Sequence, residues 1–107
     1  MDTLAAFVNC DLLKSNVGKR VRTVIKVNRI ENGAIVGEGP GGGVITVKPG
    51  RRGLDTAPNR YREVIGIAEG GSIIAEEVGT DFGDKFDLQN FNELCKLASK
   101  DFQALFM

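Results

Sequence analysis

The chain has 107 residues, a length that suits one domain with its own core. Its 14 basic and 14 acidic residues cancel, which argues against a protein whose main task is to grip nucleic acid alone. With no His and only two Cys, the chain lacks the usual ligands of a zinc site, and we expect no metal or other cofactor. Its 14 glycines favour a β protein with many turns.

The N-terminal 16 residues are expected to form an arm or a short helical turn that packs Leu12 and Leu13 onto the following domain. The apolar run Leu4–Val8 is too short for a signal sequence, and no stretch approaches the length of a membrane span. Cys10 and Cys95 lie far apart in the chain and are not expected to pair, which favours a reducing compartment.

A long strand is predicted from Val17 to Ile30, because apolar and polar residues alternate along it. Val24 and Ile30 break the alternation by adding apolar residues to the otherwise polar face. A strand that bends within a barrel and buries residues on both of its faces would show this pattern. One face of the predicted strand carries Val21, Thr23, Ile25 and Val27.

Four further strands are predicted, most of them connected by hairpins. Asn32-Gly33 is the strongest turn signal, because both residue types tolerate positive φ. A Gly/Pro-rich turn, an irregular crossing from Pro49 to Pro58 and the Gly70-Gly71 turn separate the others. The four strands are expected at residues 34–36, 44–47, 61–68 and 72–78.

A C-terminal helix is predicted after Asp87, which suits an N-cap, with Phe86 and Phe91 at the spacing of a hydrophobic staple. Apolar residues follow a heptad pattern and fill an arc of roughly 120°. This stripe either plugs its own barrel or packs against other helices. Its place after the last strand and its heptad regularity favour the second reading. The stripe comprises Leu88, Phe91, Leu94, Cys95, Ala98, Phe102, Leu105 and Phe106.

Two motifs that resemble catalytic or cofactor signatures have plainer explanations. Residues 37–42 match G-x-G-x-x-G, but a strand pattern follows where a dinucleotide site needs a helix, so we expect a hairpin loop. The acidic residues Glu76, Glu77, Asp81 and Asp84 lack a nucleophile and an orienting partner, and we expect them to be solvated. The chain is therefore not expected to be an enzyme.

A basic cluster follows the third strand and could steer a phosphate backbone, although a solvated basic loop explains it as well. Single-strand binders also stack bases on aromatic side chains, and the predicted strands hold only Tyr61. We therefore expect weak DNA contact at most. The cluster includes Lys48, and its candidate DNA contacts are Arg51, Arg52, Arg60 and Arg62.

The order of these elements resembles the smallest subunit of replication protein A, the eukaryotic heterotrimeric complex that binds single-stranded DNA. The run FGDKFDL at 82–88, followed by Phe-Asn-Glu at 91–93, is similar to the family's Phe-Asp-Leu and Tyr-Asn-Glu-Ala run. Residues 9–13, residues 18–21 and Asp101-Phe102 also fit the family. The turn at 37–43 and the crossing at 49–58 look longer or richer in glycine than the family pattern.

The resemblance implies a mainly β protein, with a five-stranded OB-fold barrel and a short arm in residues 1–86 and a trimerisation helix in residues 87–107. In this family the helix forms a parallel bundle with helices of the middle and large OB-fold subunits, which supply most of the DNA affinity. The stripe residues would then be the partner-binding residues. The implied role is non-enzymatic and nuclear, in DNA replication, repair and recombination. The small OB subunit of a telomere-capping complex and a free-standing single-strand binder remain alternatives.

Overall fold

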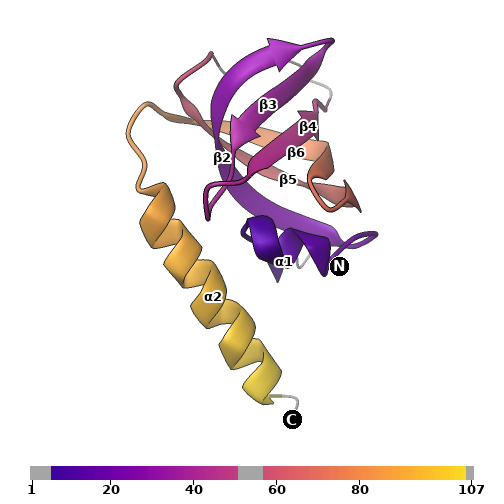
Figure 1. Ribbon diagram of the computed structural model, residues 1–107, viewed down its shortest axis with the longest axis vertical. Helices are drawn as coiled ribbons and strands as arrows, with labels where there is room; N and C mark the ends of the chain where they lie inside the picture. The colour runs from indigo at the N-terminus through magenta and orange to yellow at the C-terminus, as the bar shows by residue number, and fades with distance from the viewer. Residues whose placement is uncertain (1–5, 51–56, 106–107) are drawn as a thin grey trace.

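The computed structural model describes residues 6–50 and 57–105, with the side chains of the final helix described through Leu97. It contains a β barrel, a short helix near the N-terminus and a long C-terminal helix (Figure 1). The elements are β1 (Ala6–Phe7), α1 (Cys10–Lys14), β2 (Arg20–Glu31), β3 (Ala34–Glu38), β4 (Val44–Lys48), β5 (Tyr61–Gly70), β6 (Ile73–Gly83) and α2 (Leu88–Leu105).

The five predicted strands are present and close into a barrel. The strands follow the order β2-β3-β4-β6-β5, and β5 returns to pair with β2. The β4–β6 pair is parallel, whereas β2–β3, β3–β4, β5–β6 and β2–β5 are antiparallel. The additional strand β1 pairs in parallel with β2. It was not predicted, because two residues are too few to show the alternation of a strand.

Strand β2 bends between two neighbours, as its broken alternation predicts, but of the two residues that break the alternation only Val24 is buried, whereas Ile30 is 38% exposed. Residues 20–26 pair with β5 and residues 26–31 pair with β3, with an irregularity between Val27 and Arg29. The predicted inward residues of this strand are all buried. Val24, on the opposite face, is buried as well, and α2 contacts this strand. One strand thus contributes to the barrel core and to the side on which α2 sits.

The core is built mainly from β-branched residues, which suit a pleated and buried surface. Helix α1 lies across one end of the barrel (Figure 1) and buries Leu13, with Leu12 packed against the core. This confirms the predicted role of the N-terminal arm. Asn9 caps α1 by accepting a hydrogen bond from the Leu12 N–H at 2.8 Å.

A buried ion pair inside the barrel contradicts two sequence predictions. Arg62 and Glu76 have side chains only 1% exposed, and hydrogen bonds join Nε to Oε2 at 2.7 Å and Nη2 to Oε1 at 2.8 Å. Arg62 therefore does not present its guanidinium to DNA, and Glu76 is not solvated. Glu76 also accepts the N–H of Gly50 at 3.0 Å. A Cβ at Gly79 would meet the ends of both side chains, so a larger residue there would have to displace the pair.

Helix α2 begins as predicted and projects away from the barrel (Figure 1). The Asp87 carboxylate accepts the N–H of Asn90 at 2.9 Å, the hydrogen bond of an N-cap. The rings of Phe86 and Phe91 lie 5.9 Å apart, which confirms the hydrophobic staple. The helix runs to Leu105, and Phe106 lies outside the described residues.

Candidate functional site

A chain of aromatic rings joins the barrel to the base of α2. Phe86 lies between three neighbours, 5.7 Å from Tyr61, 5.7 Å from Phe82 and 5.9 Å from Phe91. Phe91 in turn meets Phe7 edge to face at 6.0 Å, a favoured aromatic geometry. The strands hold more aromatics than predicted, because β1 contributes Phe7 and β6 extends past Val78 to include Phe82. These rings contact one another and anchor the helix.

The first turns of α2 are fixed to the barrel by polar and apolar contacts. The Asn9 side chain donates a hydrogen bond from Nδ2 to Oδ1 of Asn92 at 2.8 Å, so the residue that caps α1 also holds α2. Cys95 is only 1% exposed, and this burial raises the pKa of its thiol to about 11. Cys95 is therefore covered by its own domain, and Phe91, which contacts Phe7, is partly covered by it.

The next apolar residues of α2 are not covered by the barrel. Leu94 is 55% exposed and Leu97 is 57% exposed. Leu97 falls outside the predicted stripe, and sequence analysis predicts no partner-binding role for it. Leu88 is half-buried at the start of the helix. The side chains of Ala98, Phe102 and Leu105 lie beyond the described side chains, although the helical backbone continues through these positions.

An apolar hollow, the junction pocket, lies where α2 meets β1. It has a volume of about 250 Å³ and is lined by Phe7, Phe91, Leu94 and Cys95. Phe7 is 44% exposed and carries the Arg22 guanidinium 5.2 Å from its ring centre, a cation–π contact. In the sequence, Phe7 stands out only as a large apolar residue ahead of the first predicted strand. No sequence pattern relates it to the C-terminal helix.

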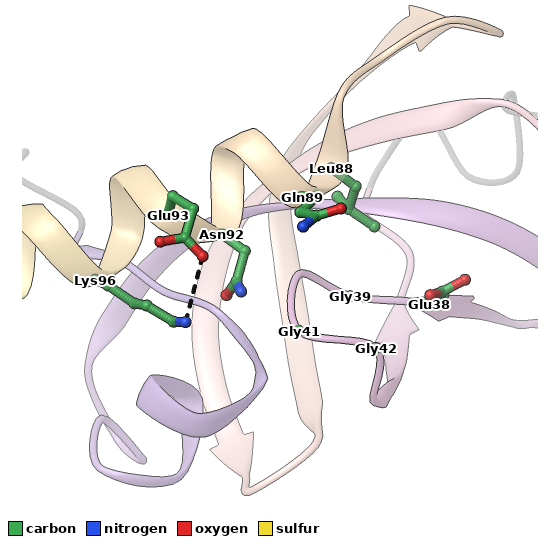
Figure 2. A pocket seen from close by; sticks show the side chains of 9 residues that line it. All are labelled: Glu38, Gly39, Gly41, Gly42, Leu88, Gln89, Asn92, Glu93 and Lys96. Atoms are coloured by element: carbon green, nitrogen blue, oxygen red, sulfur yellow. Dashed lines mark hydrogen bonds and ion pairs between the residues drawn. The ribbon is translucent and has the colours of Figure 1, made fainter.

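A second pocket of about 430 Å³, polar in character, separates the β3–β4 loop from the polar face of α2. Figure 2 shows Glu38 and the glycines of the loop on one side, and Asn92, Glu93 and Lys96 on the other. Glu93 and Lys96 form an ion pair at 3.4 Å, and Asn92 is held by Asn9. The described residues that line this pocket include no Ser, Thr or Cys.

The loop beside this pocket is the hairpin predicted for residues 37–43. The Gly39 N–H donates to the Gly43 carbonyl at 2.8 Å, and strand β4 follows where a dinucleotide site would place a helix. Gly41 and Gly42 adopt φ values of +97° and +94°, which favour glycine. The dinucleotide interpretation is thus excluded by local structure.

The predicted basic cluster does not form an open cationic track in the described part of the chain. Lys48 pairs with Glu69 at 2.7 Å, and Arg60 pairs with Asp81 at 3.1 Å. Hydrogen bonds from the Gly83 N–H and from Arg60 lower the pKa of Asp81, so the pair is charged over a wide pH range. Arg62 lies inside the barrel. Arg51 and Arg52 fall outside the described residues.

The described residues offer neither a metal-binding cluster nor a membrane-spanning helix. Nowhere among them do three or more His, Cys, Asp or Glu side chains gather in a way that could hold a metal ion. None of the described helices combines the length and the apolar character needed to cross a membrane. Cys10 and Cys95 are both free thiols.

The closed five-stranded barrel with its terminal helix places the chain among OB-fold proteins. The family model described as Replication factor A protein 3 matches residues 1–106, and the chain belongs to this family. It is 48% identical to a replication protein A 14 kDa subunit of Arabidopsis thaliana and 47% identical to that of Oryza sativa subsp. japonica. Both alignments cover all of this chain and all of the relative.

Solved structures support the same fold. Replication protein A of U. maydis, bound to single-stranded DNA, matches with a TM-score of 0.83 and 22% identity, over 99% of this chain and 98% of that chain. The telomere capping protein Ten1 of Schizosaccharomyces pombe matches with a TM-score of 0.73 and 11% identity, over 91% of this chain and 99% of that chain. At these identities the likeness shows the fold, whereas the family match separates the replication alternative from the telomeric one.

Proposed function

We propose that this chain is the small, non-enzymatic subunit of a nuclear heterotrimeric complex that binds single-stranded DNA in replication, repair and recombination. In this proposal α2 joins the chain to the middle and large OB-fold subunits through a helix bundle. The observation that carries the proposal is the exposure of Leu94 and Leu97 on a helix that projects from a closed barrel. Family membership and the names of the plant relatives supply the identity of the complex.

The barrel does not need the outer part of α2 to complete its core. Its five strands close through the β2–β5 and β4–β6 pairs, and none of the described side chains of α2, which run through Leu97, belongs to its core cluster. Exposed leucines on an amphipathic helix are costly in water, at about 25 cal/mol for each Å² of apolar surface. A partner helix would remove this cost, and the heptad continues the same surface through Ala98, Phe102, Leu105 and Phe106.

The charge arrangement supports a chain that contributes little DNA affinity by itself. Net charge is zero, and Lys48 and Arg60 are both paired with acidic side chains. Affinity for a phosphate backbone depends on cations that displace counterions, and a cation already paired with a carboxylate contributes less. In this proposal DNA therefore binds mainly through the larger subunits. Arg51 and Arg52 remain candidate contacts of this chain.

The proposal is tested by co-expression with the two larger subunits, using the full chain and a chain that ends at Lys96. The shorter chain keeps the Asn9–Asn92 hydrogen bond, the Phe7–Phe91 contact and Leu94, but it lacks Leu97 and the rest of α2. We expect the full chain to co-purify with both partners and the shorter chain to fold but lose them. Retention of both partners by the shorter chain would contradict the proposed role of α2.

A further inference from the structure

The junction pocket has the size and chemistry of a site for one large apolar side chain. All four lining residues, Phe7, Phe91, Leu94 and Cys95, are apolar. Its volume of about 250 Å³ exceeds the roughly 150 Å³ of an apolar cavity that binds benzene, and lies below the roughly 300–1,000 Å³ of typical small-molecule sites. An apolar side chain therefore suits the pocket better than a cofactor does.

The helical spacing of the lining residues indicates where such a side chain comes from. Phe91, Leu94 and Cys95 stand at positions i, i+3 and i+4, three of the four positions that surround a knob in helix–helix packing. Ala98 occupies the fourth position, i+7, in the sequence. A partner helix that follows the heptad stripe must pass over this hole.

The remaining wall of the pocket belongs to the barrel rather than to the helix. Phe7 on β1 is held between the Phe91 ring at 6.0 Å and the Arg22 guanidinium at 5.2 Å, yet 44% of it stays exposed. A side chain inserted in the pocket would therefore touch α2 and the barrel together.

Resting on the proposed function, we propose that a large apolar side chain of a partner helix inserts into the junction pocket, so that Phe7 is an interface residue. This contact would fix the orientation of the barrel relative to the helix bundle, because the inserted side chain would touch both α2 and Phe7 of β1. Within the chain, the Asn9–Asn92 hydrogen bond and the Phe7–Phe91 contact already hold α2 against the barrel, and the inserted side chain would bring the partner helix into the same set of contacts. Residues 1–5 of the same chain and a second copy of the chain are the other conceivable occupants, and the experiment separates them.

The direct test places the photo-crosslinking amino acid p-benzoyl-phenylalanine at position 7 in the assembled complex. We expect a crosslink to a helix of one of the two larger subunits. A crosslink to residues 1–5 of the same chain, or to a second copy, would overturn the proposal. The same amino acid at Val44, which is exposed on β4 and does not line the pocket, serves as the control and should not label that helix.

Substitutions give an independent measure. Truncating a well-packed interface residue often weakens binding by roughly 10- to 100-fold, and we expect an effect in this range for Phe7→Ser on assembly of the complex. Phe7→Leu keeps an apolar wall, and Val17→Ser changes an exposed residue outside the pocket, so both should stay within about threefold of the unmodified chain. Circular dichroism melts establish that each variant is folded.

The outcomes distinguish this proposal from the proposed function. If the chain ending at Lys96 loses its partners while folded Phe7→Ser keeps full affinity, α2 binds partners but the junction pocket does not receive a knob. If neither change affects assembly, the proposed function itself is wrong. Should Phe7→Ser fail to fold, the crosslink from position 7 decides.

Discussion

The barrel and the outer part of α2 use similar apolar residues in opposite ways. Inside the barrel, residues such as Ile25, Ile45 and Val64 are fully buried, and even a charged pair is enclosed and hydrogen-bonded. On α2, Leu94 and Leu97 are more than half exposed although the helix begins firmly capped and stapled. The barrel thus buries its apolar residues by itself, whereas α2 leaves two leucines exposed, and the proposed assembly through α2 rests on this difference.

The boundary between these two regions lies within α2 rather than at its start. Phe91, Asn92 and Cys95 belong to the barrel side, since they contact Phe7 and Asn9 or are buried. Helix α2 begins at Leu88, but its packing against the barrel continues as far as Cys95. Substitutions in each region can test this difference, beginning with the one of largest expected effect.

The largest effect should come from breaking the buried pair inside the barrel. Arg62→Met leaves the Glu76 carboxylate buried, with the Gly50 N–H as its remaining partner among the described contacts. Stranding a buried charge typically lowers the free energy of unfolding by about 3–5 kcal/mol, measured by urea denaturation. The double variant Arg62→Met with Glu76→Leu should recover most of the loss. Equal stability of the single and double variants would mean that the unpaired Glu76 carboxylate does not destabilise the barrel.

A change on α2 should spare the barrel and act on assembly. Leu94→Asp places a charge at an exposed position of the free chain that the proposed partner helix would bury. We expect assembly to weaken by at least about 30-fold, with little change in melting temperature of the free chain. Asn90→Asp adds the same charge at an exposed polar position of the helix and should assemble normally. Normal assembly of Leu94→Asp would remove this leucine from the interface.

A smaller effect is expected from the basic residues of the β4–β5 crossing. Arg51→Glu with Arg52→Glu should leave assembly intact and shift stability by no more than about 0.5 kcal/mol. If these residues contact DNA, the assembled complex should bind an oligonucleotide less tightly and with a shallower salt dependence, measured by fluorescence anisotropy. Loss of the complex on size exclusion would instead place the crossing at a subunit interface.

The last prediction concerns the buried thiol of Cys95, whose effect is confined to high pH. Its pKa rises from 9.0 to about 11 on folding because of desolvation. Above pH 9 the unfolded chain loses this proton while the folded chain retains it, so the thiol's contribution to stability falls as pH rises toward 11. Cys95→Ala should make the fall in stability over this window shallower, as followed by urea denaturation at several pH values. Identical pH profiles would show that the thiol does not titrate differently on folding.

Much of the fold could be predicted from sequence because its signals are local. Alternation located β2, Asn32-Gly33 located the first hairpin, and Asp87 with Phe86 and Phe91 located the start of α2. These features depend on neighbours within a few residues, so the residue types are sufficient to reveal them.

The interior ion pair and the junction were missed because they join residues that are distant in sequence. Arg62 shares its strand face with buried Val64, and Glu76 shares one with buried Ile74, so alternation pointed both inward. Sequence analysis nevertheless places Arg62 and Glu76 at the surface, because an unpaired buried charge is costly and the sequence does not reveal that the two residues pair. The contact between Phe7 and Phe91 could not be predicted either, because the two residues are far apart in sequence and no local pattern relates the N-terminal arm to the last helix.

Hydrogen exchange of the backbone amides, compared between the free chain and the assembled heterotrimer, tests the central claim most directly. An unpacked helical segment opens readily, so in the free chain the amides of residues 97–105 should exchange much faster than those of β2 and β5. On assembly we expect residues 97–105 to become strongly protected while the barrel changes little. If the outer helix is already as protected as the barrel in the free chain and gains nothing on assembly, then α2 is not the element that completes its packing against partners.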